Sequence, residues 1–202
     1  MKKIFAMMLA LAMMFSMVAC GGKTTEPTTA PTEAPTEEPT AAPTEESTTE
    51  PAEVAVNVET ATMEEILNKV VEINPVEFMG GTMPIDLTDT SEDGLWMLKD
   101  NTGLENADNI TDAAVFGPMM GSIAFSMVMV RTAEGADVKA VAETMKDNID
   151  PRKWICVEAD DLQVVSYGDV IMLIMVDSQN GMTSQSFVDA FAQVCGGTVT
   201  TY

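Results

Sequence analysis

Apolar residues recur at helical spacing in three segments, residues 62–73, 137–149 and 184–194. In each segment they are three or four positions apart, which places them on one face of a helix. Thr62 and Glu65 also match the capping box that begins many helices. We therefore predict three amphipathic helices, whose apolar faces are Met63, Ile66, Leu67, Val70 and Val71; Val138, Val141, Ala142, Met145 and Ile149; and Phe187, Val188, Phe191, Val194 and Cys195.

Four shorter apolar runs, residues 110–116, 123–131, 162–167 and 170–176, have the length and composition of β-strands. A glycine-containing turn lies between the members of each pair, and the turn at Gly168 suits a tight hairpin. Both pairs are therefore expected to be antiparallel hairpins.

Two segments carry weaker signals. Residues 74–84 contain two glycines and two prolines and are expected to form a loop. Residues 88–104 are ambiguous, although Ser91 and the two acids after it suit the start of a short helix that runs through Trp96 and Leu98. This segment is left open between a loop and a helix.

The resulting order predicts an α+β fold, a two-layer sandwich with a mostly antiparallel sheet of about four strands and helices packed on it. Every residue of 170–176 is apolar, so this strand should be central and covered on both sides. Helices 137–149 and 184–194 are expected to cover one face, and helix 62–73 or a partner protein the other. Part of that second face should stay uncovered, near a group of methionines: Met119, Met120, Met127, Met129, Met172 and Met175.

Some of these runs resemble a known family. The run AFSMVMV at 124–130, the following helix, and residues 162–174 and 187–191 are similar to a domain of unknown function. That domain is carried by many lipoproteins of anaerobic, low-GC Gram-positive bacteria, and the likeness covers about residues 63–194. This chain is poorer in lysine and richer in methionine than such domains. The resemblance implies no established activity and no site residues.

The amino terminus has the features of an export signal. Lys2 and Lys3 precede an apolar run, residues 4–18, that is too short to span a bilayer comfortably but suits a signal peptide. The run ends in small residues followed by Cys20, which resembles a bacterial lipoprotein signal. We therefore predict that residues 1–19 are a signal peptide and that Cys20 is lipidated, with acyl chains that anchor the protein at the extracytoplasmic face of the cell membrane. An uncleaved anchor and an ordinary secreted protein are the alternatives.

Residues 20–54 form the next segment, in which prolines recur every four residues among Thr, Glu and Ala. Such a chain buries too little apolar surface to offset the entropy lost on ordering, so we expect a disordered linker. Extended as polyproline II, it would reach about 100 Å from the membrane. Residues 55–202 are then expected to form a single domain.

The net charge of −22 argues against binding to nucleic acid or to anionic membrane surfaces, which calls for basic clusters. It is consistent with solubility alone or with a cationic partner. The chain contains no histidine, which excludes histidine-based catalysis and histidine-ligated metal sites. No catalytic, cofactor-binding or metal-binding residue is assigned, and no cofactor is expected.

Three weaker signals remain. Asp89, Ser91 and Asp93 match part of an EF-hand calcium loop, but a polar loop at a helix start is the simpler interpretation. Cys156 and Cys195 form either a disulfide or a pair of buried thiols, and the helix face of Cys195 favours the second. Adjacent acids, Glu92–Asp93 and Asp160–Asp161, have the chemistry of glycoside hydrolysis but are more typical of solvated loops.

Together these features predict a lipid-anchored, non-enzymatic module that binds a protein, a peptide or an envelope polymer. The alternative is an envelope enzyme that uses carboxylates only, such as a glycan-directed hydrolase. A third interpretation, a small-molecule receptor serving a transporter, is disfavoured because such receptors usually have two lobes and this domain is short.

Overall fold

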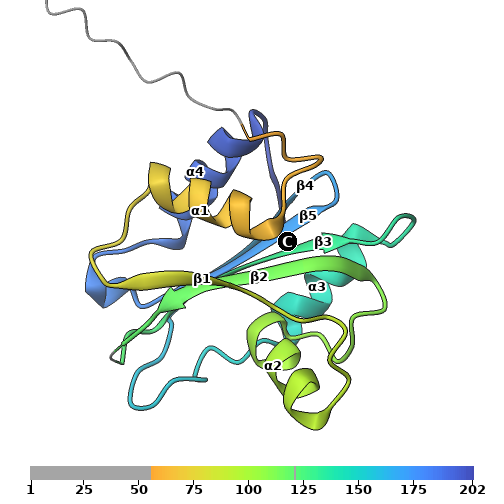
Figure 1. The fold of residues 1–202 in the computed structure, drawn as a ribbon. Helices are drawn as coiled ribbons and strands as arrows, with labels where there is room; N and C mark the ends of the chain where they lie inside the picture. Colours follow the sequence, from red (N-terminus) through yellow and green to blue (C-terminus); the bar gives the residue numbers. More distant parts are fainter. Residues whose placement is uncertain (1–55, 121) are drawn as a thin grey trace, which may run out of the picture. The chain divides into compact units, whose positions relative to one another are not determined.

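A six-stranded antiparallel sheet runs through the fold, with helices on both of its faces (Figure 1). The structure is a computed structural model, and it describes residues 56–120 and 122–202. The predicted signal peptide, Cys20 and the whole of the predicted linker lie outside these residues. The strand order is β1-β2-β3-β5-β4-β6, with bounds Gly80–Pro84, Ile110–Pro118, Phe125–Thr132, Val170–Val176, Asp161–Tyr167 and Thr200–Thr201 in that order.

Strand β5 lies in the interior of the sheet, hydrogen-bonded to β3 on one side and to β4 on the other. All seven of its residues are buried. Its hairpin with β4 turns at Gly168, which has a φ of +59° that glycine adopts without strain. The prediction that residues 170–176 form a central strand covered on both sides is confirmed.

The three predicted amphipathic helices are present, and the first of them has the predicted capping box. Helix α1 (Met63–Ile73) begins with the Thr62–Glu65 capping box, which satisfies backbone donors that the first turn leaves free. Asp137 caps α3 (Val138–Asn148), and Thr183 caps α4 (Ser184–Cys195). The segment left open at 88–104 contains helix α2 (Glu92–Thr102), and a short 3-10 helix η1 (Ser178–Asn180) follows β5.

The prediction of about four strands was incomplete, because two edge strands complete the sheet. Residues 74–84 were expected to be a loop, but β1 lies there and pairs with β2. The glycine at position 80 serves close packing, since a Cβ atom there would lie 2.3 Å from the ring of Phe116. The second missed strand, β6, has only two residues and pairs with β4.

The helices form layers on both faces, so the predicted two-layer sandwich was wrong. Helices α1 and α4 lie on one face of the sheet, and α2 and α3 lie on the other, as Figure 1 shows. Two crossovers explain this arrangement. Helix α3 joins the parallel strands β3 and β4 across β5, and α4 joins the parallel strands β5 and β6 across β4. Both connections move two positions along the sheet toward β6, but their starting strands, β3 and β5, run in opposite directions. The right-handed preference of such crossovers therefore places α3 and α4 on opposite faces.

Each face has its own apolar core. On one side, residues of α1 and α4 pack on inward-facing side chains that include Phe125, Met127 and Met172. On the other side, α2 and α3 pack on side chains that include Val128, Leu173 and Met175. The sheet is thus buried on both faces along its central strands.

Candidate functional site

The segment that resembles a calcium loop forms the start of α2. The Asp89 carboxylate accepts the backbone N–H of Ser91 at 2.9 Å, and the Ser91 hydroxyl accepts the N–H of Gly94 at 3.2 Å. Hydrogen bonds from the Ser91 side chain and backbone lower the pKa of Asp89. Within the described ranges, no three His, Cys, Asp or Glu side chains are grouped closely enough to hold a metal ion. The segment is thus a polar loop whose Ser91 caps the start of α2.

The adjacent acids Asp160 and Asp161 hold the connection between β5 and α4. Asp160 accepts hydrogen bonds from the backbone N–H and the hydroxyl of Ser178, at 2.7 and 2.6 Å. These bonds lower the pKa of Asp160 from its ordinary value of 3.8. Asp161 accepts the equivalent pair of bonds from Ser184 at the beginning of α4, at 2.8 and 2.6 Å. The two carboxylates therefore position loops, and each of their oxygens accepts a hydrogen bond.

Both described cysteines are free thiols, so the disulfide alternative is not realised. Cys195 is partly buried at the end of α4, and burial raises its pKa to about 12. Cys156 is exposed, which corrects the expectation of two buried thiols. It has a positive φ of 65°, an uncommon conformation for a residue that carries a side chain.

The expectation that a methionine-rich part of the central sheet stays uncovered was wrong. Met127, Met129, Met172 and Met175 are fully buried, divided between the two cores. The reason is the three-layer arrangement, because helices cover the central strands from both sides. Of the six methionines considered, only Met119 and Met120, which follow β2, are exposed.

Exposed methionines do occur, at the β1 edge of the sheet. Met79, Gly81 and Met83 alternate along the chain and so point to the same side of β1. Met83 lies opposite Val115, which belongs to the core on the α2 side. The sulfur of Met119 lies 3.4 Å from the position that a Cβ atom would take on Gly81. The three methionines are thus neighbours on one face, with 60 to 69% of their surface exposed.

Helix α2 extends this exposed apolar surface. Trp96 is 64% exposed, Met97 is 50% exposed, and both line a hollow of about 370 Å³ together with Met83. The hollow lies beside β1 and the second half of β2, with Gly117 contributing no side chain to it. We call the exposed surface the methionine–tryptophan strip and define it as Met79, Met83, Trp96, Met97 and Met119.

Lys153 lies beneath the strip and lines the same hollow. Its side chain is only 8% exposed, and its amine donates to the backbone carbonyl of Asp100 at 3.0 Å and to Asn101 and Ser126 at 3.4 Å. Burial lowers the pKa of this amine, while the Asp100 carboxylate opposes the shift. These hydrogen bonds connect the 150–160 segment, which contains Lys153, to the end of α2 and to β3.

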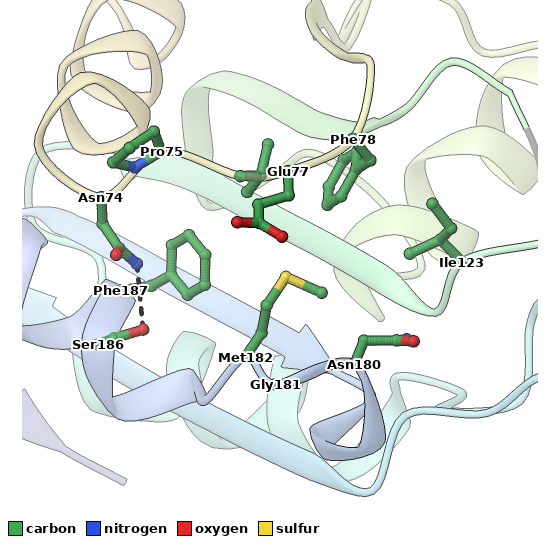
Figure 2. A pocket seen from close by; sticks show the side chains of 11 residues that line it. Asn74, Pro75, Glu77, Phe78, Ile123, Asn180, Gly181, Met182, Ser186 and Phe187 are labelled. Carbon is green, nitrogen blue, oxygen red and sulfur yellow. Dashed lines mark hydrogen bonds between the residues drawn. The ribbon is translucent and has the colours of Figure 1, made fainter. Parts of the chain in front are cut away.

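A second hollow, which we call the loop cavity, has a volume of about 500 Å³ (Figure 2). It lies between the α1–β1 connection, the loop before β3, and the segment from η1 into α4. Its apolar lining includes Phe78, Phe187 and Met182, and Figure 2 shows the carboxylate of Glu77 pointing into the space between them. Its walls are held by fixed contacts, since the Asn74 amide donates to the Ser186 hydroxyl at 3.0 Å.

The residues of these two hollows were not identified from the sequence. Glu77 and Phe78 lie in the segment expected to be a loop, and nothing in its composition marks them as part of a cavity. Met119 was noted only as a member of a methionine group assigned to the sheet. The one usable signal was Trp96, a large apolar side chain next to Met97 in a short helix.

Comparisons with known proteins add no relative. No protein-family model, curated protein or solved structure matches the chain. In the part of the chain that the structure describes, no helix is both long enough and apolar enough to cross a membrane. The family resemblance therefore stays a prediction, and functional inference depends on the geometry of the strip and the loop cavity.

Proposed function

We propose that this chain is a lipoprotein, anchored through acyl chains on Cys20 at the extracytoplasmic face of a bacterial membrane, whose domain is a non-enzymatic protein-binding module. The observation that carries the binding role is the methionine–tryptophan strip. It is an exposed apolar surface to which β1, the residue after β2 and helix α2 contribute.

The composition of the strip favours a protein as its partner. Methionine side chains are flexible and polarizable, so they adapt to apolar side chains of varied shape. Tryptophan is enriched among the residues that dominate binding energy at protein interfaces. An apolar patch on a soluble domain is otherwise a liability, which suggests that a partner covers it.

The charge around the strip indicates what the partner carries. Glu92 and Asp93 precede Trp96 by four and three residues on α2, so they share its helix face. The chain as a whole has a net charge of −22. An apolar segment flanked by lysine or arginine would complement this surface, both in its contacts and in long-range attraction.

The alternative, an envelope enzyme using carboxylates only, has less support. The Asp160–Asp161 pair is engaged in loop hydrogen bonds, as described above. The hollow beside the strip and the loop cavity are each lined by one carboxylate, Asp100 and Glu77 respectively. Glycoside hydrolysis typically needs a pair of carboxylates that flank one bond.

The proposal is tested by capture of partners from solubilised membranes with the intact lipoprotein. Replacement of the exposed aromatic, Trp96→Asp, should reduce recovery of the specific partner at least about tenfold, because hot-spot losses typically exceed 2 kcal/mol. The matched control is Thr144→Asp, an exposed position on α3 that gains the same charge. Both variants should retain the parent melting temperature within a few degrees. Equal recovery of the same proteins by the two variants would remove the strip from consideration.

A further inference from the structure

The loop cavity lies apart from the methionine–tryptophan strip and has a different chemical character. Its aromatic residues belong to the core on the α1 and α4 side of the sheet, whereas Met83 of the strip faces the α2 side. Its volume of about 500 Å³ is in the range of small-molecule sites, roughly 300–1,000 Å³. It therefore has room for a small organic group independently of any partner on the strip.

The walls of the cavity combine apolar side chains with polar ones, and the aromatic side is well supported. Phe78 and Phe187 both pack against Phe125, with ring centroids 5.1 Å apart in each case. Phe187 and Phe125 are almost completely buried, so these contacts fix one side of the cavity within the core. A ligand would thus meet mainly the ring of Phe78, which its packing on the core holds in place, and this limits the ordering cost of binding.

Glu77 is the only charged residue that lines the cavity. Among the described residues, no hydrogen bond or ion pair engages its carboxylate. The amides nearby are already used, since Asn74 donates to Ser186 and Asn180 donates to Asp177. The cavity thus combines one free negative charge with aromatic rings and the thioether of Met182.

We propose that the loop cavity binds an organic cation, an amine or guanidinium group on an apolar body, with the Glu77 carboxylate as its counter-ion. The apolar body would contact Phe78 and Met182, with Phe187 almost completely buried behind them. The face of an aromatic ring carries negative electrostatic potential, so the ring of Phe78 would add to the attraction that the carboxylate exerts on a cation. No basic residue lines the cavity to favour an anion, and the net charge of −22 repels one.

The test measures charge preference with molecules of similar size. Binding of 2-phenylethylamine, of neutral 2-phenylethanol and of anionic phenylacetate to the purified full-length protein is measured by calorimetry and by NMR shifts of the cavity residues. We expect the amine to bind about 5- to 10-fold more tightly than the alcohol, from one partly exposed ion pair and one cation–π contact. Phenylacetate should bind most weakly.

The variant Glu77→Gln should reduce the preference for the amine at least about threefold, because it removes the counter-ion and keeps the side-chain volume. The control Glu59→Gln removes the same charge from an exposed position outside the cavity and should preserve the preference. A further arm compares N-acetyl-lysine amide with 2-phenylethylamine. Tighter binding of the lysine derivative identifies a protein side chain as the natural source, and the reverse identifies a free amine.

Three results would overturn the inference. These are equal binding of the alcohol and the amine, an unchanged preference in Glu77→Gln, and no binding of any of these compounds at millimolar concentration. None of them bears on the strip, because capture through Trp96 uses a different surface and a different measurement.

Discussion

At the scale of single residues, the two described thiols have contrasting surroundings. Cys156 is exposed in the 150–160 segment, whereas Cys195 is partly enclosed at the end of α4 with a pKa raised to about 12 by burial. Because the thiolate is the reactive form, the two residues should differ strongly in their reactivity. The difference provides a check on the packing around α4.

We predict that Cys195 exchanges with a small disulfide reagent at pH 8 much more slowly in the native protein than in urea. Raising the pKa from 9.0 to about 12 lowers the thiolate fraction at pH 8 about a thousandfold. A more basic thiolate is also a stronger nucleophile, which restores part of the lost reaction rate. The net reduction should be about 30-fold, with steric protection adding to it. Peptide mass mapping after timed quenching measures each cysteine separately.

Cys156 serves as the internal control and should react rapidly in the folded state, since it is exposed. Native Cys195 reacting as fast as it does in urea would show that the end of α4 is open. The sign of the pH effect is also defined. Because the folded pKa is the higher one, the stabilisation associated with the neutral thiol is complete below pH 9 and is lost as the pH rises toward 12.

At the scale of elements, strand β5 holds the two layers of helices together. Its seven residues are buried, and alternate side chains enter the core of α1 and α4 or that of α2 and α3. Ile174 lies in the first of these cores and is paired with Met127 on one side and Gln163 on the other.

We predict that Ile174→Asp prevents stable folding. It would place an unpaired carboxylate in an apolar core, a cost of at least about 3–5 kcal/mol against a total stability of about 5–15 kcal/mol. Ile174→Ala, which only leaves a cavity, should fold with about 2–5 kcal/mol less stability. Urea unfolding followed by circular dichroism measures both variants.

The matched control is Thr111→Asp, an exposed position on β2, which should change stability by less than about 1 kcal/mol. A melting temperature of Ile174→Asp equal to that of the parent would contradict the position of β5. Loss of stability by the control as well would mean that the sheet tolerates no added charge, and then the comparison with Ile174 would carry no information about burial.

The success of sequence-based prediction also varies by element. Helices α1, α3 and α4 were identified because their period and caps are local, as with Thr62 and Glu65. Strand β1 was missed because its two glycines and its proline have the composition of a turn. In the sheet, Gly80 allows the close approach of Phe116, Gly81 faces Met119, and Pro84 is the last residue of the strand. The layer of each helix depends on the strand order, which is a long-range property that no local pattern contains.

The difference between local patterns and long-range arrangement also applies to the candidate sites. The exposed strip combines residues from β1, α2 and the turn after β2, which become neighbours only in the folded sheet. The loop cavity combines Glu77 with Phe187, 110 residues further along the chain. Trp96 and the methionine content were visible in the sequence, but their division between core and surface was not.

At the scale of the whole molecule, the two candidate sites adjoin each other where the chain enters strand β1. The cavity is lined by the segment that leads into β1, and the strip runs along β1 itself. Met79 of the strip directly follows Glu77 and Phe78 of the cavity in the sequence. The carbonyl of Met79 also accepts a hydrogen bond from the N–H of Met119, at 2.9 Å. A protein partner on the strip and a cation in the cavity would therefore contact consecutive residues of one segment.

The last prediction concerns the anchor, which determines where these sites are presented. We predict that Cys20→Ser abolishes membrane attachment of the mature protein, because the Cys20 thiol is the proposed acylation site and only a protein carrying two or more acyl chains is held stably. The variant should be found either as soluble protein or as the uncleaved precursor. Immunoblots of membrane and soluble fractions distinguish these forms, and Cys156→Ser, which keeps Cys20, should fractionate like the parent. Recovery of mature, cleaved Cys20→Ser protein in the membrane fraction would refute lipidation, and with it the proposal of a module displayed from the cell membrane.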